Sequence, residues 1–167
     1  MKRSELRQDP VSGDWILMAP GRARRPDGWH RGSPRKRQSV RECPFENPLK
    51  THDPILVYEG KRGWEVVVAN NKYPAVFERR RCGSMLREGP YMRVEGIGYH
   101  NLVITRHHDK NFAALSEDGA NQVFQVFRDR YLTLASDPCL AYISIFHNWG
   151  PSAGASVYHP HYQIIAI

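Results

Sequence analysis

The sequence lacks any apolar run long enough to cross a membrane, and no hydrophobic segment follows Met1 that would serve as a signal peptide. We therefore expect a soluble protein of the cytoplasm. Cysteine is scarce. The three residues Cys43, Cys82 and Cys139 are odd in number, and no two of them are close in the sequence. A disulfide framework is accordingly not expected, and Cys82 and Cys139 are interpreted as structural residues. The chain contains no internal repeat.

The chain of 167 residues has a hydrophobic fraction of 41% and an aromatic fraction of 11%. This composition argues against wholesale disorder and is sufficient for one core. We therefore expect residues 1–167 to form a single domain.

Acidic residues are nearly missing from one segment, residues 22–41, where eight basic residues face the single acid Asp27. The excess of basic over acidic residues in this segment equals the net charge of +7 of the whole chain. A concentrated positive segment indicates an anionic partner, either a phosphorylated small molecule or a nucleic acid. For the later half of this basic loop, a solvated flexible segment is an equally good interpretation.

Short β-rich segments dominate the predicted secondary structure. Residues 15–19 are typical of a short buried strand, residues 55–58 and 64–69 of a hairpin, and residues 77–90 of an exposed loop. Further strands are expected at 100–105, at 140–146 and at the C-terminal end of the sequence.

The sequence predicts one main helix that begins after Ser116, a residue type favoured at the N-cap, and ends at Asp137-Pro138. Its predicted apolar face is formed by Ala120, Val123, Phe127, Tyr131 and Leu134. The order of elements predicts an α+β fold, with an antiparallel sheet and one main helix packed on a face.

The last segment carries the spacing His159-x-His161-x-Gln163. In an extended segment these side chains project to one face, while Pro160 and Tyr162 project to the other. Imidazoles serve as nucleophiles, bases or metal ligands near neutral pH, and an amide can hold a phosphoryl oxygen. The preceding loop supplies backbone and side-chain donors from Asn148, Gly150, Gly154 and Ser156. Donors around a histidine row suit reactions at phosphorus, where charge develops on the oxygens.

These residues, taken together, resemble the signature of the galactose-1-phosphate uridylyltransferase family, a branch of the histidine triad superfamily. The similarity covers five motifs in order along nearly the whole chain and corresponds to the N-terminal half of the family. The motifs are Asp9-Pro10-x3-Asp14-Trp15 with Arg22-Ala23-Arg24-Arg25-Pro26, Cys43-Pro44-Phe45, Asn71-Lys72-Tyr73-Pro74-Ala75, His108, and the run from Asn148 to Gln163.

The resemblance implies a histidine-triad-like fold and a two-step transfer of UMP between a UDP-hexose and a hexose 1-phosphate. His161 would be the catalytic nucleophile and would carry the nucleotide covalently, which the chemistry of a neutral imidazole permits. The substrates would be bound by Arg22, Arg25, Asn71, Asn148, Gly154, Ser156 and Gln163.

The resemblance also implies one structural zinc site. The ligands would be Cys43, Glu46, His108 and His159, with Glu46 in place of the second cysteine of the family pattern. Zinc accepts S, N and O ligands, so this set is chemically possible. The alternative is a metal-free segment with Cys43 merely buried, and His107 is a lesser ligand candidate.

The family's second, homologous half has no counterpart in this sequence. Since histidine triad proteins pair two units into one continuous sheet, a homodimer is expected. Two other functions are open: a nucleotide hydrolase or phosphorylase of the same superfamily, including one specific for an adenylyl sugar nucleotide, and a nucleic-acid-binding module using the basic loop. The latter lacks the interleaved aromatic residues of such modules, so nucleic acid is not the expected partner.

Overall fold

The computed structural model describes residues 4–24 and 37–167, and its larger sheet is antiparallel with the strand order β3-β4-β7-β9-β8. Its strands are β3 (Pro54–Gly60), β4 (Gly63–Asn70), β7 (Tyr99–Thr105), β8 (Ile143–Phe146) and β9 (His161–Ala166). The predicted hairpin is confirmed as β3 and β4, and the strand predicted at 100–105 is β7. The strand predicted at 140–146 is shorter and begins at Ile143.

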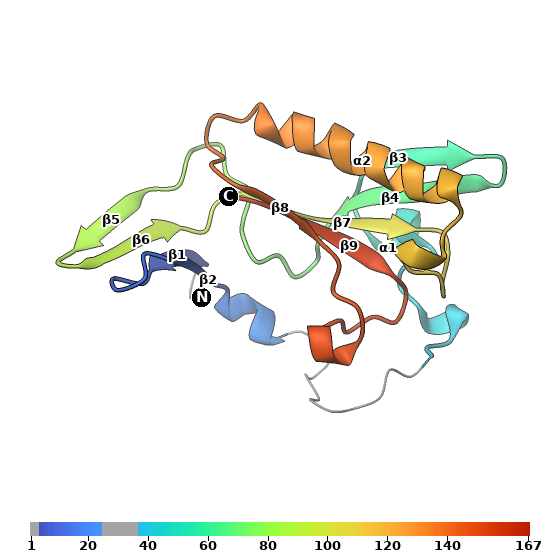
Figure 1. Ribbon diagram of the computed structural model, residues 1–167, viewed down its shortest axis with the longest axis horizontal. Coiled ribbons are helices and arrows are strands. Elements are labelled where there is room, and N and C mark those ends of the chain that lie inside the picture. The colour runs from blue at the N-terminus through green and yellow to red at the C-terminus, as the bar shows by residue number, and fades with distance from the viewer. Residues whose placement is uncertain (1–3, 25–36) are drawn as a thin grey trace.

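The main helix, α2 (Glu117–Ala135), lies across one face of this sheet (Figure 1). Its N-cap is confirmed, because the backbone N–H of Gly119 donates to the Ser116 hydroxyl oxygen at 3.2 Å. The predicted α+β arrangement of an antiparallel sheet with one main helix is therefore confirmed.

The core fills the space between α2 and the sheet. Val123, Val126 and Leu134 of the helix pack in one cluster with Tyr162 and Ile164 of β9. The helix face was predicted correctly for Val123 and Leu134.

The predicted place of Tyr131 on that face was wrong, since its side chain is 45% exposed. Arg130 is buried instead, and its Nε donates to Asn101 Oδ1 at 2.9 Å. This bond compensates in part for the loss of hydration of the guanidinium.

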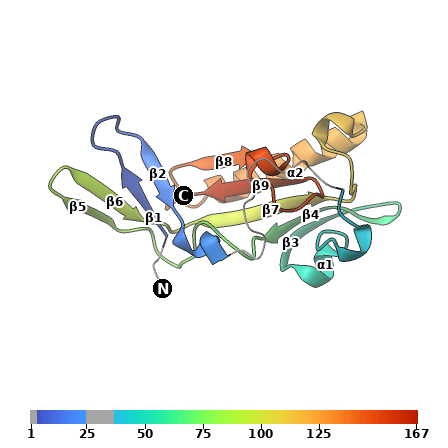
Figure 2. The same ribbon diagram turned by 90° about the horizontal axis from the view of Figure 1, so that it is seen from below.

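A second, four-stranded sheet has the order β2-β1-β6-β5 and lies beside one end of the larger sheet (Figure 2). It contains β1 (Glu5–Gln8), β2 (Trp15–Met18), β5 (Met85–Glu88) and β6 (Tyr91–Glu95). The sequence prediction was wrong on two points here. The strand at Trp15 is exposed rather than buried, with Ile16 51% accessible, and residues 77–90 include β5 instead of forming only a loop.

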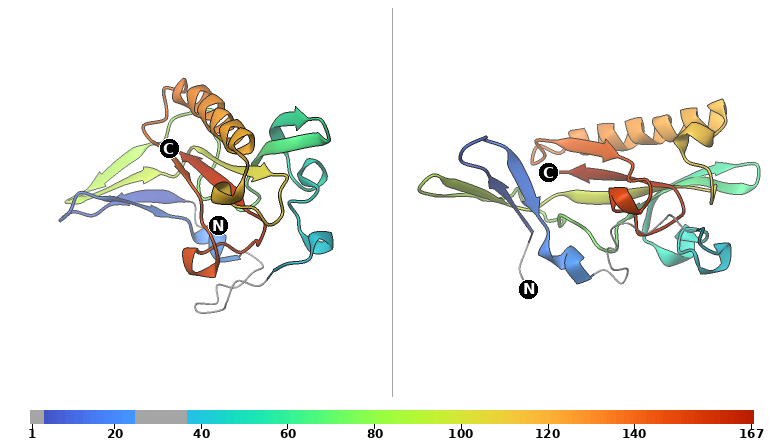
Figure 3. Two further views of the ribbon diagram at one scale, coloured as in Figure 1. Left: turned by 45° about the vertical axis from the view of Figure 1, so that its right-hand side comes forward. Right: turned by 60° about the horizontal axis from the view of Figure 1, so that its bottom comes forward.

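The short helices are η1 (Pro20–Arg24), η2 (Val40–Glu42), α1 (Pro48–Thr51), η3 (Phe112–Ala114) and η4 (Pro151–Ala153). Both η1 and η4 lie on the side of the larger sheet opposite α2 (Figure 3). Most of the predicted basic loop, residues 25–36, lies outside the described residues. Within the described part of the chain, no helix has the length and apolar character needed to cross a bilayer.

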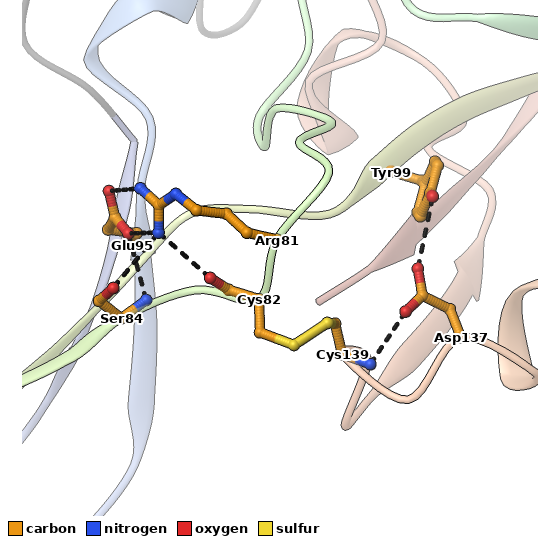
Figure 4. Close-up of a disulfide and its surroundings, with 7 residues drawn as sticks. All are labelled: Arg81, Cys82, Ser84, Glu95, Tyr99, Asp137 and Cys139. Atoms are coloured by element: carbon orange, nitrogen blue, oxygen red, sulfur yellow. Dashed lines mark hydrogen bonds and ion pairs between the residues drawn. A yellow bond between two sulfur atoms is a disulfide. The ribbon is translucent and has the colours of Figure 1, made fainter.

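A disulfide joins Cys82 to Cys139 and ties the base of the β5–β6 hairpin to the segment that follows α2 (Figure 4). The expectation that these cysteines would not form a disulfide was wrong, because the fold brings two distant segments to a Cα–Cα distance of 4.8 Å. Disulfides are typical of oxidising compartments. The cytoplasmic location stays a prediction.

Reduction of this disulfide is expected to lower the free energy of unfolding by about 2–4 kcal/mol, because the bond closes a long loop in the unfolded chain. The two cysteines are 57 positions apart. Urea unfolding with and without a thiol reductant measures the difference, and a double Cys82→Ala/Cys139→Ala variant should be insensitive to the reductant. Equal stability of the wild type under both conditions would contradict the prediction.

Candidate active site and metal centre

A cavity of about 250 Å³ opens on the face of the larger sheet opposite α2. Residues of β7 and β9 alternate between the two faces: Tyr162 packs in the core beneath α2, while His161 and Gln163 line the cavity. The predicted separation of His161 and Gln163 from Tyr162 is therefore confirmed. His159 precedes β9 and lies at a neighbouring cluster rather than in the cavity wall.

The cavity brings together residues from distant parts of the sequence. Of the predicted substrate-binding and catalytic residues, those that line it are Arg22, Asn71, Gly154, Ser156, His161 and Gln163. Asn148 lies two residues after β8 and is not among the lining residues, so its substrate contact stays a prediction. The predicted contact of Arg25 falls outside the described residues.

Sequence reasoning missed several lining residues, among them Phe45, His52 and Lys72. Phe45 and Lys72 stand inside recognised motifs, so their proximity to the motif positions was an available signal. His52 had no such signal. It reaches the cavity because α1 turns the chain back after Phe45, and the two rings lie 5.2 Å apart.

His161 holds a defined tautomer. Its Nδ1 lies 2.9 Å from the backbone carbonyl oxygen of His159. A carbonyl only accepts, so Nδ1 carries the proton and Nε2 keeps its lone pair. Burial lowers the pKa of His161 to about 4, so the ring is neutral near pH 7. A neutral imidazole with an unprotonated Nε2 at a cavity is the form required of a nucleophile.

Two side chains of the cavity wall are held in place by hydrogen bonds to the backbone. Arg22 donates from Nη1 to the carbonyl oxygen of Tyr73 at 2.6 Å, and Asn71 Oδ1 accepts from the Tyr73 N–H at 2.9 Å. Gly154 ends η4 with a φ of +78°, a conformation that residues with a β-carbon rarely adopt. This glycine turns the loop toward Ser156 at the cavity wall.

A second cluster lies next to this cavity and contains Cys43, Glu46, His108 and His159. Each offers one potential ligand atom, and these atoms all lie within 4.8 Å of one another. Cys43 Sγ is 3.6 Å from His159 Nδ1, and Glu46 Oε1 is 2.6 Å from His108 Nδ1 and 3.1 Å from His159 Nδ1. The predicted ligand set therefore converges, and His107 is not part of it.

The hydrogen bonds of the two histidines direct two ring lone pairs toward the Glu46 carboxylate. His108 Nε2 lies 2.9 Å from the Gln38 carbonyl oxygen, and His159 Nε2 lies 2.7 Å from that of Thr105. Both Nε2 atoms therefore carry protons, and both Nδ1 lone pairs face the Glu46 carboxylate. These groups repel one another unless a proton or metal ion lies between them. The arrangement, in which a carbonyl holds each histidine at the nitrogen that points away from the cluster, could hold zinc.

Burial lowers the pKa of His159 and raises the pKa of the Cys43 thiol. The first shift favours the neutral imidazole that binds metal. The second keeps the thiol protonated until a metal displaces its proton. Metal affinity is accordingly expected to rise with pH.

Comparisons with known proteins give matches over nearly the whole chain. The family profile described as "Galactose-1-phosphate uridyl transferase, N-terminal domain" matches residues 1–166. ADP-glucose phosphorylase of Arabidopsis thaliana is 30% identical over 169 residues, with 98% of this chain and 48% of that protein covered. Galactose-1-phosphate uridylyltransferase of Thermotoga maritima is 26% identical over 165 residues, with 97% and 46% covered.

A hypothetical histidine triad nucleotide-binding protein from Sulfolobus tokodaii strain7 shares the fold. Its TM-score is 0.51 at 22% identity, with 74% of this chain and 68% of that chain covered. The chain spans about half the length of the curated relatives it matches. Because the family profile covers residues 1–166, the chain belongs to the galactose-1-phosphate uridyl transferase family and corresponds to its N-terminal domain.

Proposed function

We propose that the protein is a nucleotidyltransferase that moves UMP between a UDP-hexose and a hexose 1-phosphate through a nucleotidyl-His161 intermediate. The observation that carries this proposal is the state of His161, whose protonated Nδ1 is held by the His159 carbonyl and whose Nε2 keeps its lone pair. The ring lines a cavity together with Arg22, Ser156 and Gln163, which can hold phosphoryl oxygens.

In the first step, Nε2 of His161 forms a bond to the α-phosphorus of the sugar nucleotide. The bond from that phosphorus to the bridging oxygen breaks, and the hexose 1-phosphate leaves with the electron pair. In the second step, a phosphate oxygen of the incoming sugar 1-phosphate attacks the same phosphorus, and the P–N bond returns its electrons to Nε2. Donors from Ser156 and Gln163 stabilise the charge on the phosphoryl oxygens.

The remaining predicted residues have supporting roles in this proposal. Asn71 and Gly154 line the cavity and would contact the nucleotide, and Arg22, also in the lining, would supply positive charge to the diphosphate. Arg25 and Asn148 are proposed substrate contacts on the family resemblance alone. Zinc would be held by the four residues of the ligand cluster, Cys43, Glu46, His108 and His159. It would connect the segment after η2 to the residues just before β9, the strand that carries His161.

A second candidate is an ADP-sugar phosphorylase that uses the same nucleophile, with inorganic phosphate as acceptor. The observation that supports it is the 30% identity over 169 residues to ADP-glucose phosphorylase of Arabidopsis thaliana. Galactose-1-phosphate uridylyltransferase of Streptomyces lividans is also 30% identical, over 163 residues, so experiment and not sequence identity separates the two candidates. Both candidates share the covalent first step and differ in the base and in the acceptor.

Incubation with UDP-glucose or ADP-glucose, each labelled in the α-phosphate, tests the proposal. A UMP adduct that galactose 1-phosphate discharges supports the uridylyltransferase. An AMP adduct that phosphate discharges supports the phosphorylase, and release of the nucleoside monophosphate without acceptor indicates a hydrolase. No adduct from either donor would contradict both candidates.

We further propose that residues 1–167 act as one domain and that two copies associate. Among the described strands of the larger sheet, β8 is paired on one side only, by β9, which leaves an edge for a second copy.

A further inference from the structure

His100 lies behind the wall of the cavity, near the start of β7, and its side chain is only 4% exposed. The contacts of its ring include the N–H of Ala75 at 2.9 Å from Nδ1, and Gln163 Oε1 and Asn71 Nδ2 at 3.0 and 3.1 Å from Nε2. His100 therefore links β7 to Gln163 of β9 and to the segment after β4, both of which reach the cavity.

The contact with Ala75 determines where the proton of the neutral His100 ring resides. A backbone N–H only donates, so Nδ1 accepts and the proton is on Nε2. That proton can be donated to Gln163 Oε1, whereas the NH2 group of Asn71 cannot accept it. The carboxamide of Gln163 is thus held with its oxygen toward His100, which leaves its NH2 group for the cavity.

We infer that His100 is a positioning residue for the proposed nucleotidyl transfer, acting by fixing the orientation of the Gln163 carboxamide. This inference rests on the proposed function. Phosphoryl oxygens accept hydrogen bonds, so Gln163 helps only when its NH2 group faces them, and a reversed amide would place oxygen against oxygen. Donors fixed before reaction stabilise developing charge without reorganisation.

Two variants separate positioning of Gln163 from anchoring of Ala75. In His100→Asn, the side-chain oxygen can replace Nδ1 as acceptor for Ala75, but no donor reaches Gln163. In His100→Gln, the NH2 group can reach the place of Nε2 and donate to Gln163, but no acceptor remains for Ala75. The two substitutions each keep one of the two contacts.

His100→Asn is expected to lower kcat for the transfer by about tenfold to a hundredfold, the range seen when a supporting hydrogen bond is removed. KM should change little, and His100→Gln should retain most of kcat. In a Gln163→Ala background, His100→Asn should have almost no further effect, because the two residues act as one unit. If His100→Gln is impaired and His100→Asn is active, or if the two effects multiply, the inference is overturned.

Nitrogen NMR of the wild type separates this inference from the proposed function and does not depend on activity. We expect the His100 ring to be protonated at Nε2. The chemical shift of that proton should change in the Gln163→Leu variant. If neither sugar nucleotide forms an adduct, the proposed transfer fails while the predicted tautomer can still be observed. A ring protonated at Nδ1, or a shift unaffected by Gln163→Leu, overturns the positioning contact even in an active enzyme.

Discussion

Replacement of His161 by alanine is expected to abolish the covalent nucleotidyl adduct and to lower turnover by more than about a thousandfold. The reason is the loss of the group that forms the bond to phosphorus. The other cavity-lining histidine, His52, is not equivalent. Its Nδ1 lies 2.9 Å from the hydroxyl of Thr51, which can donate or accept, so no carbonyl fixes its tautomer as one does for His161. The measurement is retention of the α-phosphate label on denatured protein, together with the rate of sugar exchange.

A matched variant, His161→Gln, controls for the loss of volume at the cavity wall. The His161 ring lies 4.8 Å from the ring of Phe45, so glutamine fills part of the same space without offering a nucleophilic nitrogen. Both variants are expected to keep the unfolding midpoint near that of the wild type and to bind UMP or AMP. An adduct that persists in His161→Ala would assign the nucleophile to another residue.

Replacement of His108 by alanine is expected to reduce bound zinc from about one ion per chain to almost none, because zinc in structural sites requires four ligands. At a zinc concentration a thousand times the dissociation constant, loss of the site lowers the free energy of unfolding by about 4 kcal/mol. Metal analysis of the purified protein and urea unfolding with and without a chelator measure the two effects.

The neighbouring His107→Ala variant is the control, since His107 lies outside the ligand cluster. It should retain zinc and show the same response to chelator as the wild type. His159→Ala is expected to lose metal and stability as well, and unchanged zinc content in that variant would remove His159 from the ligand set. A wild type without zinc whose stability is unaffected by the chelator would contradict the metal site as a whole.

The larger sheet and α2 could be predicted because their patterns are long and local. Ser116 and the apolar spacing define a helix, and the runs at β4 and β7 are continuous enough to indicate buried strands. The second sheet could not be predicted in the same way. Its strands have four or five residues each, too few to show a period. The hairpins β1–β2 and β5–β6 become one sheet only through the pairing of β1 with β6, whose partners are 84 to 90 positions apart.

The ligand cluster was predicted from family motifs, whereas the contacts of His100 are visible only in the tertiary structure. Its contacts with Ala75 and Gln163 join positions 25 and 63 residues away. Nothing in the local sequence distinguishes this histidine from one packed in a core. The pairing of Cys82 with Cys139 is similar, since the spacing of cysteines does not indicate which ones meet.

The sequence by itself determined the fold class and the family and predicted the nucleophile, because alternation along a strand and adjacent motifs are properties of short segments. Only the tertiary structure decided which ring nitrogen of His100 and of His159 carries the proton. That choice depends on backbone groups of other segments, namely the Ala75 N–H at His100 and the Thr105 carbonyl at His159. A ring nitrogen next to a carbonyl carries the proton, and one next to an N–H group does not. In these two histidines the neighbouring backbone group comes from a segment that is distant in the chain.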